Sequence, residues 1–587
     1  MRKFFLGFAV GIVFAGALLF LAALIGVLTG VGRKPHVAGN SALVLNLEGS
    51  LPEQPPTEIP IPFFEQQQAL TVAETWNLLQ RAATDKRIKA LVLEPRGLSV
   101  GWAKLEELRG DLVAFKKSGK PIYAYLRSAG TREYYLATAA DRIFISPEDE
   151  LDVKGMRAEL MFVKGTLDKL GVKMEFEHVG KYKDAPDMFT KDGSSAETRE
   201  VLNQLLDQFY GDFVDAVAEG RKKPAEAVRA VIDNGPFVGS EAKEGGLVDD
   251  LAYEDQMYEK LEAAKGKFTK LAARSYAKAL GETLGAAKGE RVAFIVGQGD
   301  ITRGATNAEA GDDGITTAGM VKLLREARED DSIKGVILRV DSPGGDGIAS
   351  DDILHEAKLL SQKKPLVISM SDLAASGGYY ISMTGDPVVA YPNTETGSIG
   401  VFFGKVNLHG LYDKIGMNKE IYKRGRFADI DTEYAPLNDT QRAKLRSEIE
   451  VFYHGFVEKV AEGRKRKYEE VDELAQGRVW TGQQAKQNGL VDELGGIDQA
   501  IAMVKQRAKI SSGVMLVPYP QRRTVLDVLL DRDGPSLGAR IWGGQQERME
   551  QQLGERFRTL FGDTSLLRGA LAQGGILSLM PYRVTIR

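Results

Sequence analysis

The chain has 587 residues, which is too long for one ordinary hydrophobic core and predicts several folding units. Its formal net charge of −4 is small for this length, and no long basic stretch interleaved with aromatic residues occurs, so nucleic acid is excluded as an expected partner. The absence of cysteine excludes disulfide bonds, thiolate catalysis and cysteine-ligated metals, and we expect no bound cofactor or metal ion.

The first segment is long and apolar. Residues 4–32 carry no charged side chain, and about 20 apolar residues suffice to span a bilayer as a helix. The run is longer than the apolar part of a secretory signal peptide, and Gly30-Val31-Gly32 is a poor cleavage site. Two basic residues flank the run on each side, and because their charges nearly balance they do not determine the orientation of the segment across the membrane. We predict that residues 1–34 form an uncleaved membrane anchor.

The rest of the chain repeats itself. Residues 85–93 (DKRIKALVL) resemble residues 330–338 (DDSIKGVIL), and Tyr134-Tyr135 matches Tyr379-Tyr380 at the same offset of 245 positions (379 − 134). Glycine-rich matches follow later in both halves. Self-similarity at a fixed spacing indicates a duplicated structural unit. We therefore predict two copies of one domain, at 41–285 and 290–515.

Each copy has the pattern of an α/β domain. Short apolar runs rich in branched residues predict buried strands. Helical spacing follows, as in residues 348–362. Strands that alternate with helices predict a largely parallel sheet covered by helices. The predicted strands are 42–47, 89–93 and 122–126 in the first copy and 291–296, 335–340 and 366–370 in the second.

The C-terminal tail, 516–587, has no counterpart in the repeat. Within it, residues 547–561 are rich in Glu, Gln and Arg with spaced Met, Leu and Phe, which predicts an amphipathic helix. The tail is either a packing or assembly element or an attachment to the membrane surface.

Ser376 is the first candidate for chemistry. It stands in AASGGYY (374–380), after an apolar strand and before a helix-like run. A serine at a helix N-terminus lies beside unpaired N–H groups that can stabilise an oxyanion. Serine is also a preferred N-cap, so a plain capping role is the alternative.

A glycine-rich turn is the second candidate. In DSPGG (341–345), Gly344 and Gly345 let the backbone approach a ligand and turn N–H groups inward, although a plain turn would also fit. Because the turn and Ser376 both follow predicted neighbouring strands, they predict a ligand-binding crevice.

A nucleophilic serine needs a base. None of the five histidines lies in a recognisable triad signature. A lysine can serve when desolvation lowers its pKa and leaves a neutral amine. Lys183, in GKYKDAPDMF (180–189), is the candidate, although most lysines are merely solvated. Its neighbour Asp184 would oppose that desolvation effect, and we expect Asp184 to point away.

The repeat links these candidates. At the 245 offset Ser376 corresponds to Thr131, so the first copy lacks the serine, and Lys183 corresponds to Ala428, so the second copy lacks the lysine. The glycines show the same pattern: Gly377 corresponds to Arg132, and Gly344 and Gly345 correspond to Ser99 and Val100. Lys181, by contrast, corresponds to Arg426, so both copies stay basic at that position. Each half has lost what the other retains. One composite site between the copies explains this pattern and selects Lys183 over Lys181.

These motifs resemble a known family. SPGG (342–345), ASGGYY (375–380), TGSIG (396–400) and GKYK (180–183) are similar to signal peptide peptidase A, or protease IV, in its long double-domain form. The resemblance implies a Clp/crotonase-like fold in each copy and a serine–lysine dyad of Ser376 as nucleophile and Lys183 as general base. It also implies an oxyanion hole from Gly377 with Gly344 or Gly345, and Ser398 as the serine that orients the lysine.

The same resemblance implies substrates and a setting. The expected substrates are remnant signal peptides, and the expected assembly is a homotetramer. The expected location is the bacterial inner membrane, with the catalytic domains facing the periplasm. Two other classes stay open: a catalytically silent membrane scaffold of the same fold, and an acyl-thioester enzyme, since crotonase-like folds host that chemistry.

Overall fold

The computed structural model describes residues 35–55, 69–281, 284–286, 288–304, 314–519 and 576–580. The predicted anchor at 1–34 and the predicted amphipathic helix at 547–561 lie outside these ranges. Among the described residues, no helix combines the length and apolarity needed to cross a bilayer.

The first copy is built on a parallel sheet of six strands in the order β10–β1–β2–β3–β5–β9. Its central strands are apolar and buried on both faces, as expected for a parallel sheet covered by helices. The strands are β1 (Ser41–Glu48), β2 (Ile88–Arg96), β3 (Ile122–Leu126), β5 (Arg142–Ile145), β9 (Asp250–Leu251) and β10 (Thr269–Ala272).

The second copy has the same strand order. Its larger sheet runs β11–β23–β12–β15–β17–β18–β22, with β19 and β21 attached beside β17. From β23 to β22 the neighbours are parallel, and they follow the order of the first sheet. The strands are β11 (Leu284–Gly285), β12 (Glu290–Gln298), β15 (Ile333–Ser342), β17 (Leu366–Ala375), β18 (Val388–Ala390), β19 (Glu395–Gly397), β21 (Val479–Thr481), β22 (Glu493–Leu494) and β23 (Val514–Tyr519).

The helices repeat as well. In each copy a helix of 26 residues ends at a lysine with positive φ, α7 (Ala196–Arg221) before Lys222 and α17 (Asp439–Arg464) before Lys465. The α/β fold predicted for both copies is confirmed. The other helices are α2 (Val72–Thr84), α3 (Trp102–Lys116), α4 (Thr131–Ala137), α5 (Lys164–Leu170), α6 (Asp187–Thr190), α8 (Ala225–Ile232), α9 (Gly239–Glu244), α10 (Glu254–Lys265), α11 (Ala273–Leu280), α13 (Thr317–Glu329), α14 (Gly347–Lys363), α15 (Gly377–Ile381), α16 (His409–Ile415), α18 (Tyr468–Leu474), α19 (Gly482–Asn488) and α20 (Ile497–Arg507).

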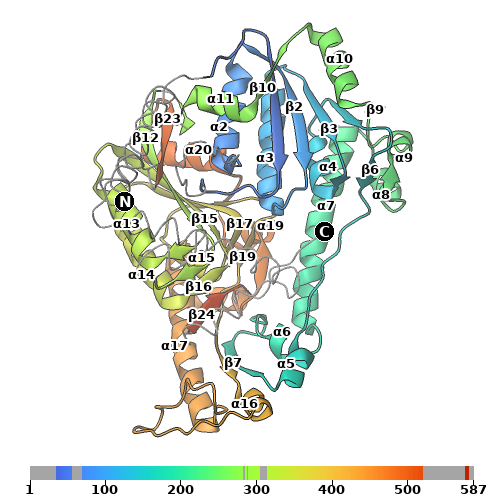
Figure 1. Cartoon of the computed structure of the whole chain (residues 1–587). Helices are drawn as coiled ribbons and strands as arrows, with labels where there is room; N and C mark the ends of the chain where they lie inside the picture. The colour runs from blue at the N-terminus through green and yellow to red at the C-terminus, as the bar shows by residue number, and fades with distance from the viewer. Residues whose placement is uncertain are drawn as a thin grey trace, which may run out of the picture.

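Buried charges hold the two copies against each other. Arg339 of β15 is fully buried and donates to Glu107 of α3 at 2.6 Å and to Glu53 at 3.0 Å. Lys104 of α3 donates to Asp341 at 2.6 Å. Buried charges are tolerated only when paired, so these contacts fix how the copies face each other. Figure 1 shows α2, α3 and α20 gathered at this junction between the blue and the yellow sheets.

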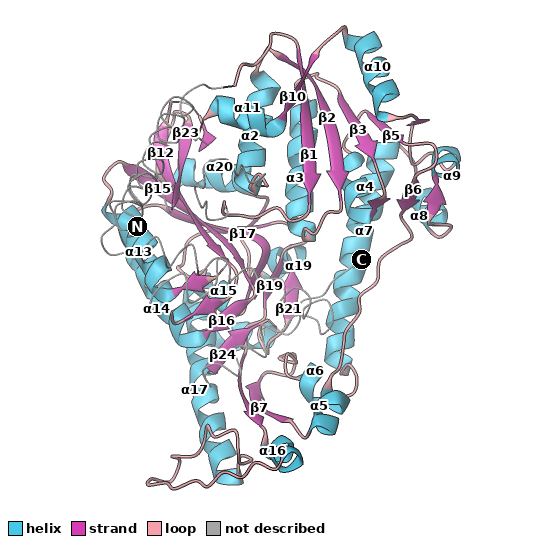
Figure 2. Ribbon diagram, viewed as in Figure 1, coloured by secondary structure: helices cyan, strands magenta, loops and turns pink. Residues whose placement is uncertain are grey.

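A third sheet contains strands from both copies. Its order is β14–β13–β16–β24–β20–β7, and β7 of the first copy pairs antiparallel with β20 of the second, from Lys173↔Asn407 to Val179↔Val401. In Figure 2, β7 lies with α5, α6 and α16 at the end of the molecule away from the first sheet. This pairing carries the chain after β7 into the second copy. The strands are β7 (Lys173–Val179), β13 (Ile301–Thr302), β14 (Ile315–Thr316), β16 (Gly344–Asp346), β20 (Val401–Asn407) and β24 (Ile576–Leu579).

A small sheet completes the first copy. Its order is β4–β6–β8, formed by β4 (Ala129–Gly130), β6 (Glu150–Asp152) and β8 (Phe237–Val238).

Candidate active site

Ser376 stands at the sharp junction between β17 and α15. Its backbone has φ +54° and ψ −112°, a region that non-glycine residues rarely adopt. Such strain persists only where the surroundings enforce it, and here the Ser376 N–H donates to the Gly397 carbonyl at 2.8 Å. The residue occupies the N-cap position, but its hydroxyl makes no capping hydrogen bond. The hydroxyl is therefore free of the structural role that a capping serine would have.

Lys183 reaches the same place from the first copy. After β7 the chain turns at Gly180, and the Tyr182 N–H donates to the Gln476 carbonyl at 2.8 Å. The Lys183 side chain is then fully buried inside the second copy. The β7–β20 pairing and this backbone hydrogen bond explain how a residue so distant in sequence meets Ser376.

The lysine amine faces three oxygens. Lys183 Nζ lies 2.9 Å from Ser376 Oγ, 2.9 Å from Ser398 Oγ and 3.2 Å from the Ser398 carbonyl oxygen. An ammonium has three N–H donors, which matches three acceptors. A neutral amine has two, which the Ser398 oxygens accept, and its lone pair is then left for the Ser376 hydroxyl proton. The surroundings thus satisfy the lysine both before and after it takes a proton.

Burial sets the charge of this lysine. Desolvation lowers the pKa of Lys183 well below its ordinary value, and the nearby Asp184 carboxylate opposes this only in part. Asp184 is itself buried, and its side chain accepts a hydrogen bond from Thr198 of α7 rather than from Lys183. Desolvation raises the pKa of Asp184 to about 6. The low-dielectric surroundings therefore favour a neutral amine next to the hydroxyl.

The glycine turn adjoins the serine. Gly344 and Gly345 have φ of +105° and +155°, and a Cβ on Gly377 would lie 3.1 Å from both Gly344 Cα and the Gly345 nitrogen. The Gly344 N–H donates to Ser342 Oγ at 3.1 Å, so it is already engaged within the turn. Gly377 is the first residue of α15, where N–H groups lack partners inside the helix. Gly345 lies in β16 between Ile301 of β13 and Ser578 of β24, so the turn brings both of its glycines next to Gly377.

Ser398 is also strained. It has φ +49°, is fully buried, and donates its N–H to the Arg478 carbonyl at 2.7 Å. The structure thus brings Ser376, Lys183 and Ser398 together. Thr131, the counterpart of Ser376 in the first copy, begins α4. Ala428, the counterpart of Lys183 in the second copy, lies in a turn.

Two glycines in contact with the lysine are absent from the sequence-based predictions. A Cβ on Gly477, which has φ +78°, would lie 2.6 Å from the Lys183 nitrogen and Cβ. A Cβ on Gly400 would lie 3.2 Å from Lys183 Cδ. These glycines let two loops of the second copy pack directly against Lys183. Gly400 belongs to the TGSIG motif, which could have indicated it.

A third hydroxyl at the site is also absent from those predictions. Ser578 of β24 is fully buried, and its Oγ lies 2.8 Å from Ser376 Oγ. The short apolar run ILSLM (576–580), interrupted only by Ser578, is the local signal of a strand there.

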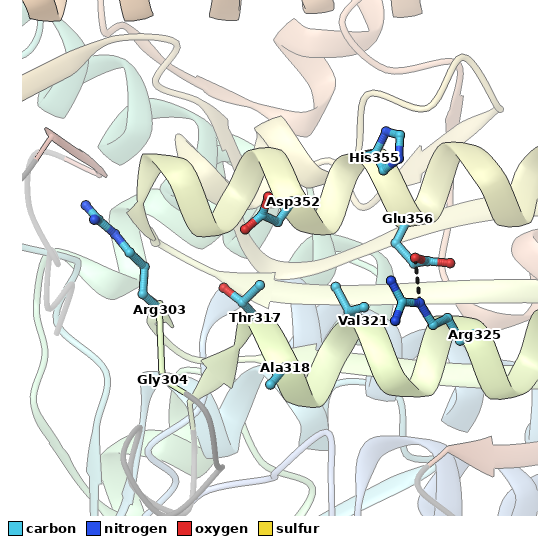
Figure 3. Close-up of a pocket in the computed structure, with 9 residues that line it drawn as sticks. All are labelled: Arg303, Gly304, Thr317, Ala318, Val321, Arg325, Asp352, His355 and Glu356. Atoms are coloured by element: carbon cyan, nitrogen blue, oxygen red, sulfur yellow. Dashed lines mark hydrogen bonds and ion pairs between the residues drawn. The ribbon is translucent and has the colours of Figure 1, made fainter.

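An open cavity lies apart from these residues. Among the described residues, no group of three or more His, Asp or Glu could hold a metal ion. A cavity of about 370 Å³ lies between α13 and α14, where Arg325 donates to Glu356 at 2.8 Å (Figure 3). Ser376, Lys183 and Ser398 do not line it. The lining residues are Arg303, Gly304, Thr317, Ala318, Val321, Arg325, Asp352, His355 and Glu356.

Comparison with known proteins places this geometry in context. The sequence model of peptidase family S49 matches residues 114–267 and 358–511. The serine protease SPPA, chloroplastic, of Arabidopsis thaliana is 35% identical over 511 residues, 86% of this chain and 74% of that protein. Protease 4 of Haemophilus influenzae is 32% identical over 527 residues, 84% of this chain and 83% of that protein. ClpP1 from Listeria monocytogenes matches in structure at 15% identity over 35% of this chain and 91% of its own, with a TM-score of 0.21.

Proposed function

From the premise that the chain belongs to peptidase family S49, and is a serine peptidase, we propose that Ser376 is its nucleophile and Lys183 its general base. One observation carries this proposal. The amine and the hydroxyl lie 2.9 Å apart, fully buried, at the meeting of two copies that each lack the other's group.

The chemistry follows from the contacts. Neutral Lys183 takes the Ser376 proton, and the alkoxide attacks the carbonyl carbon of a peptide bond. The N–H groups of Gly377 and of Gly345 or Gly344 hold the developing oxyanion, each worth about 3 kcal/mol of barrier. The ammonium then protonates the leaving amine. A water molecule, deprotonated by the lysine, hydrolyses the acyl-enzyme and frees Ser376.

Ser398 has a positioning role in this proposal. Its Oγ and carbonyl oxygen accept from Lys183 Nζ, which leaves the lone pair of the neutral amine directed at Ser376. The strained backbone of Ser398 is the cost of presenting both oxygens to one amine.

The proposal extends to the protein's membrane location, assembly and substrates. Residues 1–34 have the length and composition of a membrane anchor, and the motifs resemble signal peptide peptidase A. We therefore propose a membrane-anchored endopeptidase, active as a homotetramer on the periplasmic side of a bacterial inner membrane. Its substrates are apolar signal peptides left in the bilayer after secretion.

Two matched pairs of variants test the catalytic assignment. Ser376→Ala should abolish both hydrolysis of an unfolded labelled protein and labelling by a serine-directed fluorophosphonate, while its repeat counterpart Thr131→Ala leaves both intact. Lys183→Met should also abolish turnover, whereas Lys181→Met, on an exposed neighbouring lysine, should not. Full activity in Ser376→Ala or Lys183→Met would refute the dyad. Replacing a synthetic signal peptide by a soluble hydrophilic peptide tests the substrate class, since equal kcat/KM for both would contradict it.

A further inference from the structure

The N-terminus of α3, in the first copy, contacts both strands that lead into the candidate active site. Lys104 Nζ donates to Asp341 Oδ2 at 2.6 Å, and Asp341 directly precedes the glycine turn 342–345. On β17, Asp372 accepts hydrogen bonds from the backbone N–H groups of Gly101 at 3.0 Å and Lys104 at 2.8 Å. The first copy thus holds a carboxylate on each strand, one beside the glycine turn and one shortly before the nucleophile.

The two carboxylates meet at a β-bulge in β17. Over residues 370–374 this strand advances by four residues while its partner β15 advances by two. Asp372 lies inside the bulge, and the Leu373 N–H, also inside it, donates to Asp341 Oδ1 at 3.1 Å. A bulge bends its strand and redirects the side chains that follow. The bulge therefore determines where Ser376 lies relative to the glycine turn.

The repeat shows that this contact is particular to the first copy. At the offset of 245 positions Gly101 corresponds to Asp346, and Lys104 corresponds to Ala349. In the second copy Asp346 caps its own helix α14, where it accepts from the Ala349 N–H at 2.9 Å. In the first copy α3 has no side-chain cap of its own, and Asp372 takes that place, so close that a Cβ on Gly101 would collide with its carboxyl group. The first copy has thus replaced its own cap by a glycine that admits a carboxylate of the second copy.

Lys104 stays charged although it is buried. Its amine contacts Asp341 and also lies 3.8 Å from Asp372 and 3.9 Å from Glu53. Burial alone would lower the pKa of Lys104, but the surrounding carboxylates outweigh burial and raise it. By contrast the Lys183 amine donates to hydroxyl and carbonyl oxygens, and its pKa is lowered by burial. The two lysines therefore differ in role, since Lys104 is a fixed cation and cannot act as a base.

This cation separates two like charges. Asp341 and Asp372 lie 2.6 and 3.8 Å from the one amine, so without it their carboxylates would repel each other and push the ends of β15 and β17 apart. We propose that Lys104 is a positioning residue for peptide hydrolysis, which holds the two carboxylates together and so aligns Ser376 with the oxyanion donors of the glycine turn. This rests on the proposed role of Ser376. The first copy then supplies both the base and the alignment of the nucleophile.

Lys104→Met in the full-length chain is the direct test, because methionine keeps most of the side chain's length and removes its charge. A shift of about 1 Å in a catalytic group costs on the order of 100-fold in rate, so kcat for an unfolded labelled protein and fluorophosphonate labelling of Ser376 should both fall by about that factor. KM and the midpoint of the pH profile should not change, because neither the bound substrate nor Lys183 is touched. The control is Asp498→Ala, which removes another hydrogen bond across the junction, from Trp76 Nε1 at 2.8 Å, and should keep the wild-type kcat.

A second substitution should reverse part of this loss. Asparagine caps a helix as well as aspartate does, so Asp372→Asn keeps a cap on α3 and removes one of the two repelling charges. We expect the double variant Lys104→Met with Asp372→Asn to be about tenfold faster than Lys104→Met alone, a coupling that distant and independent sites do not show. A double variant as slow as Lys104→Met, or slower, would overturn the proposal.

Gly101→Ala reaches the same carboxylate without changing any charge. Its backbone has φ −72°, which alanine adopts without strain, but the new Cβ must displace the Asp372 carboxyl group. We expect kcat to fall by at least about tenfold. Gly110→Ala is the control in the same helix, because a Cβ there would meet nothing within 4 Å, and its kcat should be unchanged.

The outcomes separate this proposal from the catalytic assignment. Folded Lys104→Met and Gly101→Ala chains with kcat within about threefold of the unaltered chain would overturn the positioning role. A fall in Asp498→Ala as large as in Lys104→Met would overturn it as well, because any weakening of the junction would then suffice. If Lys104→Met does not fold, the comparison of Gly101→Ala with its control decides. Absence of labelling in the unaltered chain would instead refute the proposed role of Ser376.

Discussion

Gly477 offers a sharp test of how the lysine is positioned. An alanine Cβ at this residue would lie 2.6 Å from the Lys183 nitrogen and Cβ and 2.7 Å from its Cα. These are backbone and near-backbone atoms, which cannot rotate aside as a flexible side-chain end could. Gly477→Ala must therefore move either the 476–478 loop or Lys183. A shift of about 1 Å in a catalytic group costs on the order of 100-fold in rate, so we expect kcat/KM to fall by about that factor.

The control for this variant is Gly385. Gly385 has φ +88°, close to the +78° of Gly477, but a Cβ on it would meet nothing within 4 Å. Both alanine variants therefore carry the same left-handed backbone penalty of about 1–2 kcal/mol. Only Gly477→Ala also displaces the lysine.

The assay compares thermal melting and hydrolysis of an unfolded labelled protein for both variants. Melting points should fall in both variants, and further in Gly477→Ala because of the added clash, whereas kcat/KM should fall only in Gly477→Ala. If Gly477→Ala retains kcat/KM within about threefold of Gly385→Ala, the packing of this loop does not position the base and the reasoning fails.

Four further predictions follow from the charges and hydrogen bonds of the described residues. Because burial holds the pKa of Lys183 well below its ordinary value, kcat/KM should be lost as pH falls through that lowered pKa, and a flat profile between about pH 6 and pH 10 would count against a lysine base. The unfolded chain binds more protons than the folded chain between the lowered and ordinary lysine pKa values, so the cost of burying Lys183 is full below the lowered pKa and fades as pH rises toward the ordinary value. Lys183→Met should therefore raise the melting point more at neutral pH than near about pH 10, and an effect confined to high pH would contradict this. Ser398→Ala should lower kcat about tenfold and shift the pH profile, whereas a lower kcat with an unchanged profile would indicate a merely structural role. Arg339→Met removes the cation that pairs with buried Glu53 and Glu107 and leaves only Lys104, 3.9 Å from Glu53. It should lower the free energy of unfolding by about 3–5 kcal/mol in a urea titration, and an unchanged midpoint would argue against the ionic contact.

The fold of each copy could be predicted because its signals are local. Apolar runs of branched residues predict strand 42–47, and β1 spans Ser41–Glu48; helical spacing predicts 348–362, and α14 spans Gly347–Lys363. The repeat itself supplied the long-range information, because two sequences of one fold can be compared position by position. That comparison selects Ser376 and Lys183 from the sequence alone.

The crossing of strands between the copies could not be predicted. Nothing in residues 173–179 specifies that they pair with 401–407, because strand pairing depends on where the copies dock, and docking depends on buried contacts such as Arg339 with Glu107. Gly477 was missed for the same reason, since its requirement arises only when Lys183 packs against it. In the tail, ILSLM (576–580) is too short for its periodicity to indicate a pairing partner.

The antiparallel seam between β7 and β20 has a consequence for biosynthesis. On the proposed chemistry, the first copy supplies the base Lys183 but no nucleophile. A nascent chain that has emerged from the ribosome only as far as this copy therefore lacks Ser376. The active site forms only after residues 401–407 have been synthesised and have paired as a strand with residues 173–179. On that chemistry the first copy alone has no hydrolytic activity, and activity requires the second copy to be synthesised and docked.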